Sequence, residues 1–193
     1  QMVDRSAFTV GKNLATTPGA VVYRNELMEL IQYTPTTNDV HAVPLVIFPP
    51  WINKYYILDL NEKKSLLRYL VSEGYTVFVV SWKNPTVAQA TTTFDDYLMK
   101  GMRQAVEVAR AICQVPQVHA VGYCIGGTAL AALMAWFSRE YPDAAQVPVA
   151  HWTLLATLVD FSRPGAIEVF IDKKTVATLE QMMAQQGYLD GRE

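Results

Sequence analysis

Apolar residues along the chain fall into short continuous runs separated by longer segments with helical spacing. Three runs rich in β-branched residues, at 43–48, 76–82 and 117–123, are typical of buried strands. Between them, residues 65–73 and 93–113 repeat apolar positions every three or four residues, which predicts helices. Buried strands that alternate with helices favour a mostly parallel sheet with helices on both faces.

The same pattern extends to both sides of this central region. Residues 21–23 and 27–33 alternate only in part, as expected of an antiparallel edge pair with one solvated face. Residues 126–139 are predicted to form a buried helix, and 149–157 a further strand.

The regular alternation stops near Ser162, although 174–186 keep helical character. We therefore divide the chain into residues 1–161, the N-terminal part of an α/β core, and 162–193, the start of a cap. No further strand and helix follow to finish such a sheet. The expectation is an α/β fold that is incomplete at its C-terminal side, with the cap and the final strands and helices missing.

Composition narrows the class of protein. The chain has 193 residues, of which 51% are hydrophobic and 18% charged, which suits one folded domain and argues against disorder. A formal charge of −2 gives no electrostatic basis for binding nucleic acid. No apolar run has the length of a membrane span. With two cysteines and no recognisable export signal, a reducing cytoplasm is the expected location.

The most informative motif places a cysteine between glycines. Gly122 precedes Cys124 by two residues, Gly126 follows it by two, and Gly127 comes next. This is the spacing of the strand–elbow–helix turn of α/β-hydrolases, with Cys in place of Ser. Neighbouring backbone crowds the positions two before and two after the nucleophile, so glycine is needed there.

The turn would aim the Cys124 sulfur at the N-terminus of the following helix, which favours the reactive thiolate. The backbone N–H of Ile125 would then donate to an oxyanion on an attacked carbonyl. The alternative is an inert buried cysteine in a glycine-rich turn. The strand before Cys124 and the helix after it favour the nucleophile, whereas Cys113, on an apolar helical face, is expected to pack in the core.

The loop after the first predicted parallel strand should face Cys124 across the edge of the sheet. In this superfamily such a loop supplies the second oxyanion N–H, so the backbone of Trp51 or Ile52 is the expected donor. A rigid turn at Pro49 and Pro50, without a catalytic role, is the alternative.

Beyond the elbow, several segments resemble the polyhydroxyalkanoate synthases, which are polymerases of the α/β-hydrolase superfamily. The segments are 49–60 (PPWINKYYILDL), 78–85 (FVVSWKNP), 94–97 (FDDY), 122–128 (GYCIGGT) and 158–161 (LVDF). The first segment is far more specific than any five-residue motif. Its sequence is most similar to the short-chain, single-subunit class I type.

This resemblance implies an acyltransferase that polymerises (R)-3-hydroxyacyl-coenzyme A, with 3-hydroxybutyryl as the expected monomer. Cys124 would be acylated and coenzyme A would leave as a product, so no cofactor and no metal are expected. The resemblance also implies a homodimer attached to polyester granules in the cytoplasm. Two alternatives remain: a thiol hydrolase that uses the same Cys124, and a non-catalytic regulatory or granule-coating module.

A nucleophile of this kind needs a base and an orienting carboxylate. His41 lies in a polar turn, His119 within the elbow strand and His151 early in the next strand, so none is a good candidate. The resemblance places the Asp and His of the triad beyond Glu193, and the chain alone is expected to be inactive. Asp160 is kept as an alternative acid, its other role being to cap the following turn.

Overall fold

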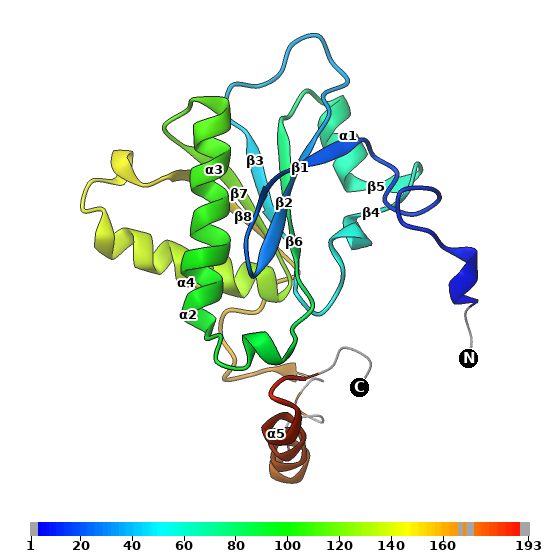
Figure 1. Cartoon of the computed structure of the whole chain (residues 1–193). Helices are drawn as coiled ribbons and strands as arrows, with labels where there is room; N and C mark the ends of the chain where they lie inside the picture. The colour runs from blue at the N-terminus through cyan, green and yellow to red at the C-terminus, as the bar shows by residue number, and fades with distance from the viewer. Residues whose placement is uncertain (1–3, 166–167, 169–171, 190–193) are drawn as a thin grey trace.

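The computed structural model describes residues 4–165, 168 and 172–189, and it centres on a six-stranded sheet (Figure 1). The strands run in the order β1-β2-β6-β3-β7-β8. Their bounds are Gly19–Arg24 (β1), Met28–Tyr33 (β2), Leu45–Phe48 (β3), Val77–Trp82 (β6), Val118–Tyr123 (β7) and Val149–Leu155 (β8).

The pairing confirms the predicted parallel sheet with an antiparallel edge pair. β3 lies between β6 and β7 and is parallel to both, and β8 is parallel to β7. β2 is antiparallel to β6, and β1 to β2. The predicted strand 149–157 ends two residues early, at Leu155, because Ala156 has a φ of 48° and leaves the extended region.

Helices cover both faces, as predicted (Figure 1). Their bounds are Leu66–Ser72 (α1), Phe94–Asp96 (α2), Gln104–Cys113 (α3), Ile125–Glu140 (α4) and Lys173–Gln186 (α5), with 3-10 turns at Arg5–Ala7, Tyr55–Leu58, Val87–Gln89 and Ala144–Gln146. Thr93 caps α2 and exchanges hydrogen bonds with Asp96, so the helix begins where the pattern predicted. Between α2 and α3, Tyr97–Arg103 form π-helix, which the apolar spacing did not reveal.

The core has two layers, one on each face of the sheet. Val46 and Phe48 of β3 belong to the layer formed with the π-helical segment, α3 and α4, which includes Met102, Leu130 and other apolar residues. The alternate residue Ile47 packs on the opposite face against α1. Strand alternation therefore divides the apolar residues between the two layers.

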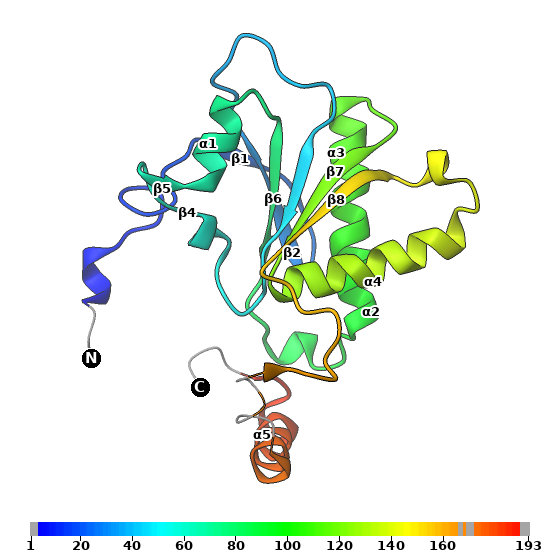
Figure 2. The same cartoon turned by 180° about the vertical axis from the view of Figure 1, so that it is seen from behind.

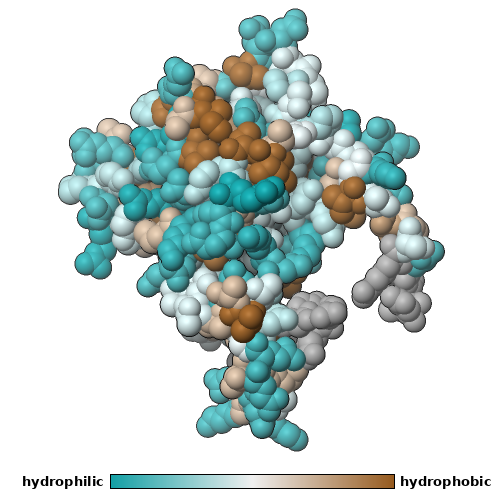
Figure 3. Space-filling view, viewed as in Figure 1, coloured by the Kyte–Doolittle hydropathy of each residue, from teal (hydrophilic) through white to brown (hydrophobic). Residues whose placement is uncertain are grey.

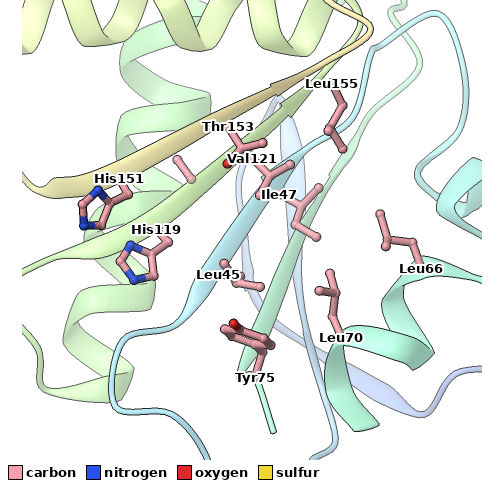
Figure 4. A pocket seen from close by; sticks show the side chains of 11 residues that line it. Leu45, Ile47, Leu66, Leu70, Tyr75, His119, Val121, His151, Thr153 and Leu155 are labelled. Atoms are coloured by element: carbon pink, nitrogen blue, oxygen red, sulfur yellow. The ribbon is translucent and has the colours of Figure 1, made fainter. Parts of the chain in front are cut away.

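The α1 face is covered only in part (Figure 2). Among the described residues, α1 packs beside β3 and β6, and a hollow of about 380 Å³ remains beside it over β7 and β8. Residues from these strands and α1 line the hollow, among them Leu45, Leu70, Val121 and Leu155 (Figure 4).

A small hairpin of β4 (Asp59–Asn61) and β5 (Lys64–Ser65) was not predicted. Asp59 is buried, with 1% of its surface exposed, and its carboxylate accepts hydrogen bonds from the Thr17 hydroxyl (2.7 Å) and backbone N–H (3.2 Å). This contact joins the N-terminal segment to the hairpin, and it satisfies a charged group that would be costly to bury alone.

The outer surface carries both hydrophobic and hydrophilic patches. Figure 3 shows hydrophobic atoms gathered over the upper part of the face seen in Figure 1, within mainly hydrophilic surroundings. Exposed large apolar side chains on β1 and α3 are Val21, Val22 and Ile112. Across residues 4–165, 168 and 172–189, no helix is long and apolar enough to cross a membrane.

The predicted boundary between core and cap, at 161/162, falls between β8 and α5. α5 covers the residues predicted to be helical, and none of its side chains is buried. Its C-cap, Gly187, lies near Val87 and Ala90. Residues 166–167, 169–171 and 190–193 of the predicted cap lie outside the described residues, and the division at 161/162 stays a prediction.

Candidate active site

Cys124 lies at the turn between β7 and α4, as the glycine spacing predicted. Its backbone has φ 55° and ψ −126°, a region that a side-chain-bearing residue rarely adopts. The surrounding backbone fixes this conformation, because the Cys124 N–H donates to the Leu155 carbonyl and its own carbonyl accepts from the Gly127 N–H, both at 2.9 Å. The residue is exposed, in contrast to the buried strand residues around it.

The three elbow glycines stand where no side chain fits. A Cβ on Gly122 would lie 2.4 Å from the Gly127 Cα, and one on Gly126 would lie 2.2 Å from the Phe48 carbonyl oxygen. A Cβ on Gly127 would lie 1.9 Å from the Thr157 hydroxyl oxygen. The glycines therefore let α4 begin directly against the ends of β3 and β7 and the loop after β8.

The loop after β3, residues 49–53, lies beside the start of α4. A Cβ on Gly126 would also lie 2.9 Å from the Pro49 carbonyl oxygen. Trp51 is half-buried, whereas Ile52 is 76% exposed. In the described part of the chain, neither the Trp51 nor the Ile52 N–H donates a hydrogen bond, and the assignment of one of them as an oxyanion donor stays a prediction.

Three aromatic side chains from outside this loop surround its Trp51, and sequence reasoning did not connect them. Trp51 stacks on Tyr97 with ring centroids 5.2 Å apart, and it also contacts Trp82 and Phe94 edge-on. The Trp82 indole N–H donates to the Pro49 carbonyl at 2.8 Å. Gly101 gives a signal for this packing in the sequence, because a glycine inside a helical pattern often has a packing reason. A Cβ on Gly101 would lie 2.7 Å from an atom of the Trp82 ring.

The loop after β8 completes the edge of the sheet. Its residue Ala156 has positive φ, and the Thr128 hydroxyl of α4 donates to the Leu158 carbonyl at 2.7 Å. Loops after β3, β7 and β8 thus meet at the carboxyl ends of parallel strands, where sites of α/β proteins form.

Asp160 lies in the loop after β8, but its contacts are those of a capping residue. Its carboxylate accepts a hydrogen bond from the Ser162 N–H at 2.9 Å, which lowers the pKa of this carboxyl. The side chain is exposed. Its role as the acid of a triad remains a prediction, with no histidine contact among the described residues to support it.

None of the three histidines approaches Cys124. His119 is five residues before it on β7, about 16 Å along an extended strand. Its ring lies 5.1 Å from that of His151 on β8, at the far end of the hollow in Figure 4. Burial, and then the nearby His151, lower the pKa of His119. His41 packs instead against Tyr75, with ring centroids 4.6 Å apart.

Cys113 contrasts with Cys124. It is half-buried at the end of α3 and packs against the core, which confirms the expected packing role. Burial raises the pKa of its thiol, which disfavours the reactive thiolate at neutral pH.

Comparison with solved structures identifies the class of fold. A soluble variant of monoglyceride lipase from Saccharomyces cerevisiae matches with a TM-score of 0.54 at 14% identity, covering 89% of this chain and 53% of the lipase. A protein from Agrobacterium vitis S4 matches with a TM-score of 0.51 at 14% identity, covering 89% and 61%. The mostly parallel sheet and the elbow define an α/β-hydrolase fold.

Sequence comparison is more specific. Residues 1–70 match the family described as the poly-beta-hydroxybutyrate polymerase (PhaC) N-terminus. The chain is 45% identical to the poly(3-hydroxyalkanoate) polymerase of Methylorubrum extorquens over 99% of its length, and 46% identical to subunit PhaC of Cupriavidus necator over 92%. It belongs to the poly(3-hydroxyalkanoate) polymerase family. It spans 31% and 29% of the lengths of these two relatives.

Proposed function

We propose that this chain carries the nucleophile of an acyltransferase that polymerises (R)-3-hydroxyacyl-coenzyme A, with 3-hydroxybutyryl-coenzyme A as the first substrate to test. The observation that carries the proposal is the exposed Cys124 held at positive φ between a parallel strand and a helix. Relatives that are named poly(3-hydroxyalkanoate) polymerases support the choice of reaction.

In the first step, the Cys124 thiol gives its proton to a base, and the sulfur attacks the carbonyl carbon of the substrate thioester. The carbonyl oxygen becomes an oxyanion, held by the N–H of Ile125 and that of Trp51 or Ile52. When the oxyanion collapses, the bond to the coenzyme A sulfur breaks. Coenzyme A takes up a proton and leaves, and the acyl group remains on Cys124 as a thioester.

In the second step, the hydroxyl group of a bound monomer or polyester chain attacks a thioester carbonyl and loses its proton to a base. An ester bond forms as the carbon–sulfur bond breaks, which lengthens the polymer. His41, His119 and His151 lie away from Cys124, so we assign the base to none of them. The proposal also takes a homodimer and a granule surface as partners, on the strength of the family resemblance alone.

The test uses the polypeptide as its gene encodes it, incubated with 3-hydroxybutyryl-coenzyme A. We expect Cys124→Ala to abolish coenzyme A release and the acylated species in intact-mass spectra, while Cys113→Ala retains both. Cys124→Ser should keep weak activity at most, because a hydroxyl ionises far less readily than a thiol. Polymer formed by the Cys124→Ala variant at an appreciable rate would refute the assignment.

Hydrolysis is the second candidate, because Cys124 is exposed to water and the fold is that of hydrolases. A hydrolase would release free 3-hydroxybutyrate and form no polymer. Measuring both products in the same reaction therefore separates the two functions.

A further inference from the structure

The loop after β3 is held from two sides. On one side its Pro49 carbonyl faces Gly126 at the start of α4, where a Cβ would come within 2.9 Å of the oxygen. On the other side the same oxygen accepts a hydrogen bond from the Trp82 indole N–H at 2.8 Å. Pro49 is two residues before Trp51 and three before Ile52, so a shift of its carbonyl would move the backbone that carries these two N–H groups.

The position of Trp82 is in turn set by the helix that packs on it. A Cβ on Gly101 would lie 2.7 Å and 2.9 Å from two atoms of the Trp82 ring, so only glycine lets the indole lie there. Gly101 belongs to the π-helical segment, and Tyr97 from the same segment contacts both Trp82 and Trp51. Helical segments of this kind often occur at functional sites.

From these contacts we propose that Trp82 is a positioning residue for the second oxyanion donor, an inference that rests on the function proposed above. Its indole N–H holds the Pro49 carbonyl, and its ring supports Trp51, so that the N–H of Trp51 or Ile52 faces the oxyanion formed at Cys124. In this role Trp82 acts through the loop after β3 and not on the substrate itself. Catalysis of this kind depends on donors that are fixed before the charge develops.

The experiment compares Trp82→Phe with the unaltered polypeptide as its gene encodes it. Phenylalanine keeps an aromatic ring and removes the indole N–H. We expect kcat for coenzyme A release from 3-hydroxybutyryl-coenzyme A to fall about 10- to 100-fold, because misplacing a group by about 1 Å can cost about 100-fold, and a donor that is displaced should cost less than one that is removed. We expect KM to change by less than about 3-fold, because the lost interaction forms only in the transition state.

A second substrate tests the oxyanion directly. In the dithioester analogue, sulfur replaces the carbonyl oxygen, and sulfur fits poorly between two donors placed for oxygen. The unaltered polypeptide should prefer the oxygen substrate strongly, and Trp82→Phe should reduce this preference. A purely structural defect lowers both rates together and leaves the oxygen-to-sulfur rate ratio unchanged.

Trp136→Phe is the matched control, because Trp136 is also a half-buried tryptophan that packs against the core, with the Arg103 guanidinium carbon 5.3 Å from the centre of its ring. It should keep kcat and the oxygen-to-sulfur ratio. Gly101→Ala is a second variant, which displaces the indole without removing it and should reproduce the effect of Trp82→Phe. If Trp82→Phe does not fold, the kinetics of Gly101→Ala decide whether Trp82 positions the oxyanion donor.

Unchanged kcat in Trp82→Phe, or a loss of kcat with an unchanged oxygen-to-sulfur ratio, would overturn the proposal. So would a folded Gly101→Ala variant with unaltered kinetics if Trp82→Phe fails to fold. The proposed function is tested separately: it fails if Cys124→Ala still releases coenzyme A, or if the unaltered polypeptide makes free 3-hydroxybutyrate and no polymer. Alkylation of Cys124 by iodoacetamide should proceed at the same rate in Trp82→Phe, since the nucleophile itself is not altered.

Discussion

A single methyl group at Gly126 tests the close packing of the elbow. Gly126→Ala places a Cβ 2.2 Å from the Phe48 carbonyl oxygen and 2.9 Å from that of Pro49, closer than the 3.0 Å that real Cβ atoms keep. Both oxygens belong to the backbone, so no side-chain rotation relieves the overlap. The ends of β3 and α4 must move apart instead.

Two opposing effects set the change in the free energy of unfolding of Gly126→Ala. Forcing a methyl group into a closely packed site costs about 1–3 kcal/mol, and we take the upper end because backbone must move. Alanine is favoured over glycine inside a helix by about 1 kcal/mol. The net expectation is a free energy of unfolding lowered by about 2 kcal/mol, with larger losses for Gly126→Val.

The assay is urea denaturation followed by circular dichroism, with Ala135→Gly as the control. Ala135 is exposed on the same helix, so its change to glycine reports the helix preference alone, a loss of about 1 kcal/mol. Glycine to alanine at position 126 and alanine to glycine at position 135 would then both lower the free energy of unfolding, although they are opposite changes in the same helix. A Gly126→Ala variant as stable as the unaltered protein, or more stable, would show that α4 does not pack against the end of β3 in this way.

Three further predictions follow from the contacts described. Iodoacetamide near neutral pH should alkylate Cys124 well before Cys113, because Cys124 is exposed and burial raises the pKa of Cys113; equal rates by peptide mass mapping would contradict this. Asp59→Ala should lower the free energy of unfolding by about 2–3 kcal/mol, because Thr17 loses a buried charged acceptor; an unchanged urea midpoint would contradict it. Hydrogen bonds at the N-terminus of α2, followed by the nearby Lys100, lower the pKa of Asp96 from 3.8 to about 2, so its stabilising effect is present above about pH 4 and lost as the pH falls toward 2. Asp96→Asn should therefore lower the urea midpoint at pH 5 but not at pH 2, and an equal deficit at both would refute this account.

The parts of the fold that were predictable depend on neighbours in the sequence. The strand–turn–helix around Cys124 was predicted because its glycines stand at fixed spacing from it. The helix that begins after Thr93 was predicted because its cap and its apolar spacing are local signals.

The parts that were not predictable depend on contacts between residues far apart. The β4–β5 hairpin is polar and short, and it is joined to the chain by a hydrogen bond between Thr17 and Asp59, 42 residues apart. The hydrogen bond from Trp82 to the Pro49 carbonyl joins the end of β6 to the loop after β3, 33 residues apart in sequence. Alternation and helical spacing carry no information about such pairs.

The central position of β3 has a consequence for synthesis of the chain. β3 is an entirely buried apolar strand, yet both of its partners, β6 and β7, come later in the sequence. β7 ends 75 residues after Phe48, so at about 5–20 residues per second the ribosome needs roughly 4–15 s to supply it. During that time Leu45–Phe48 stay without one of their two neighbours, and the elbow around Cys124 cannot form. The nascent chain therefore exposes the apolar segment Leu45–Phe48 before the turn that positions Cys124 can form. We expect holdase chaperones to bind this segment during synthesis.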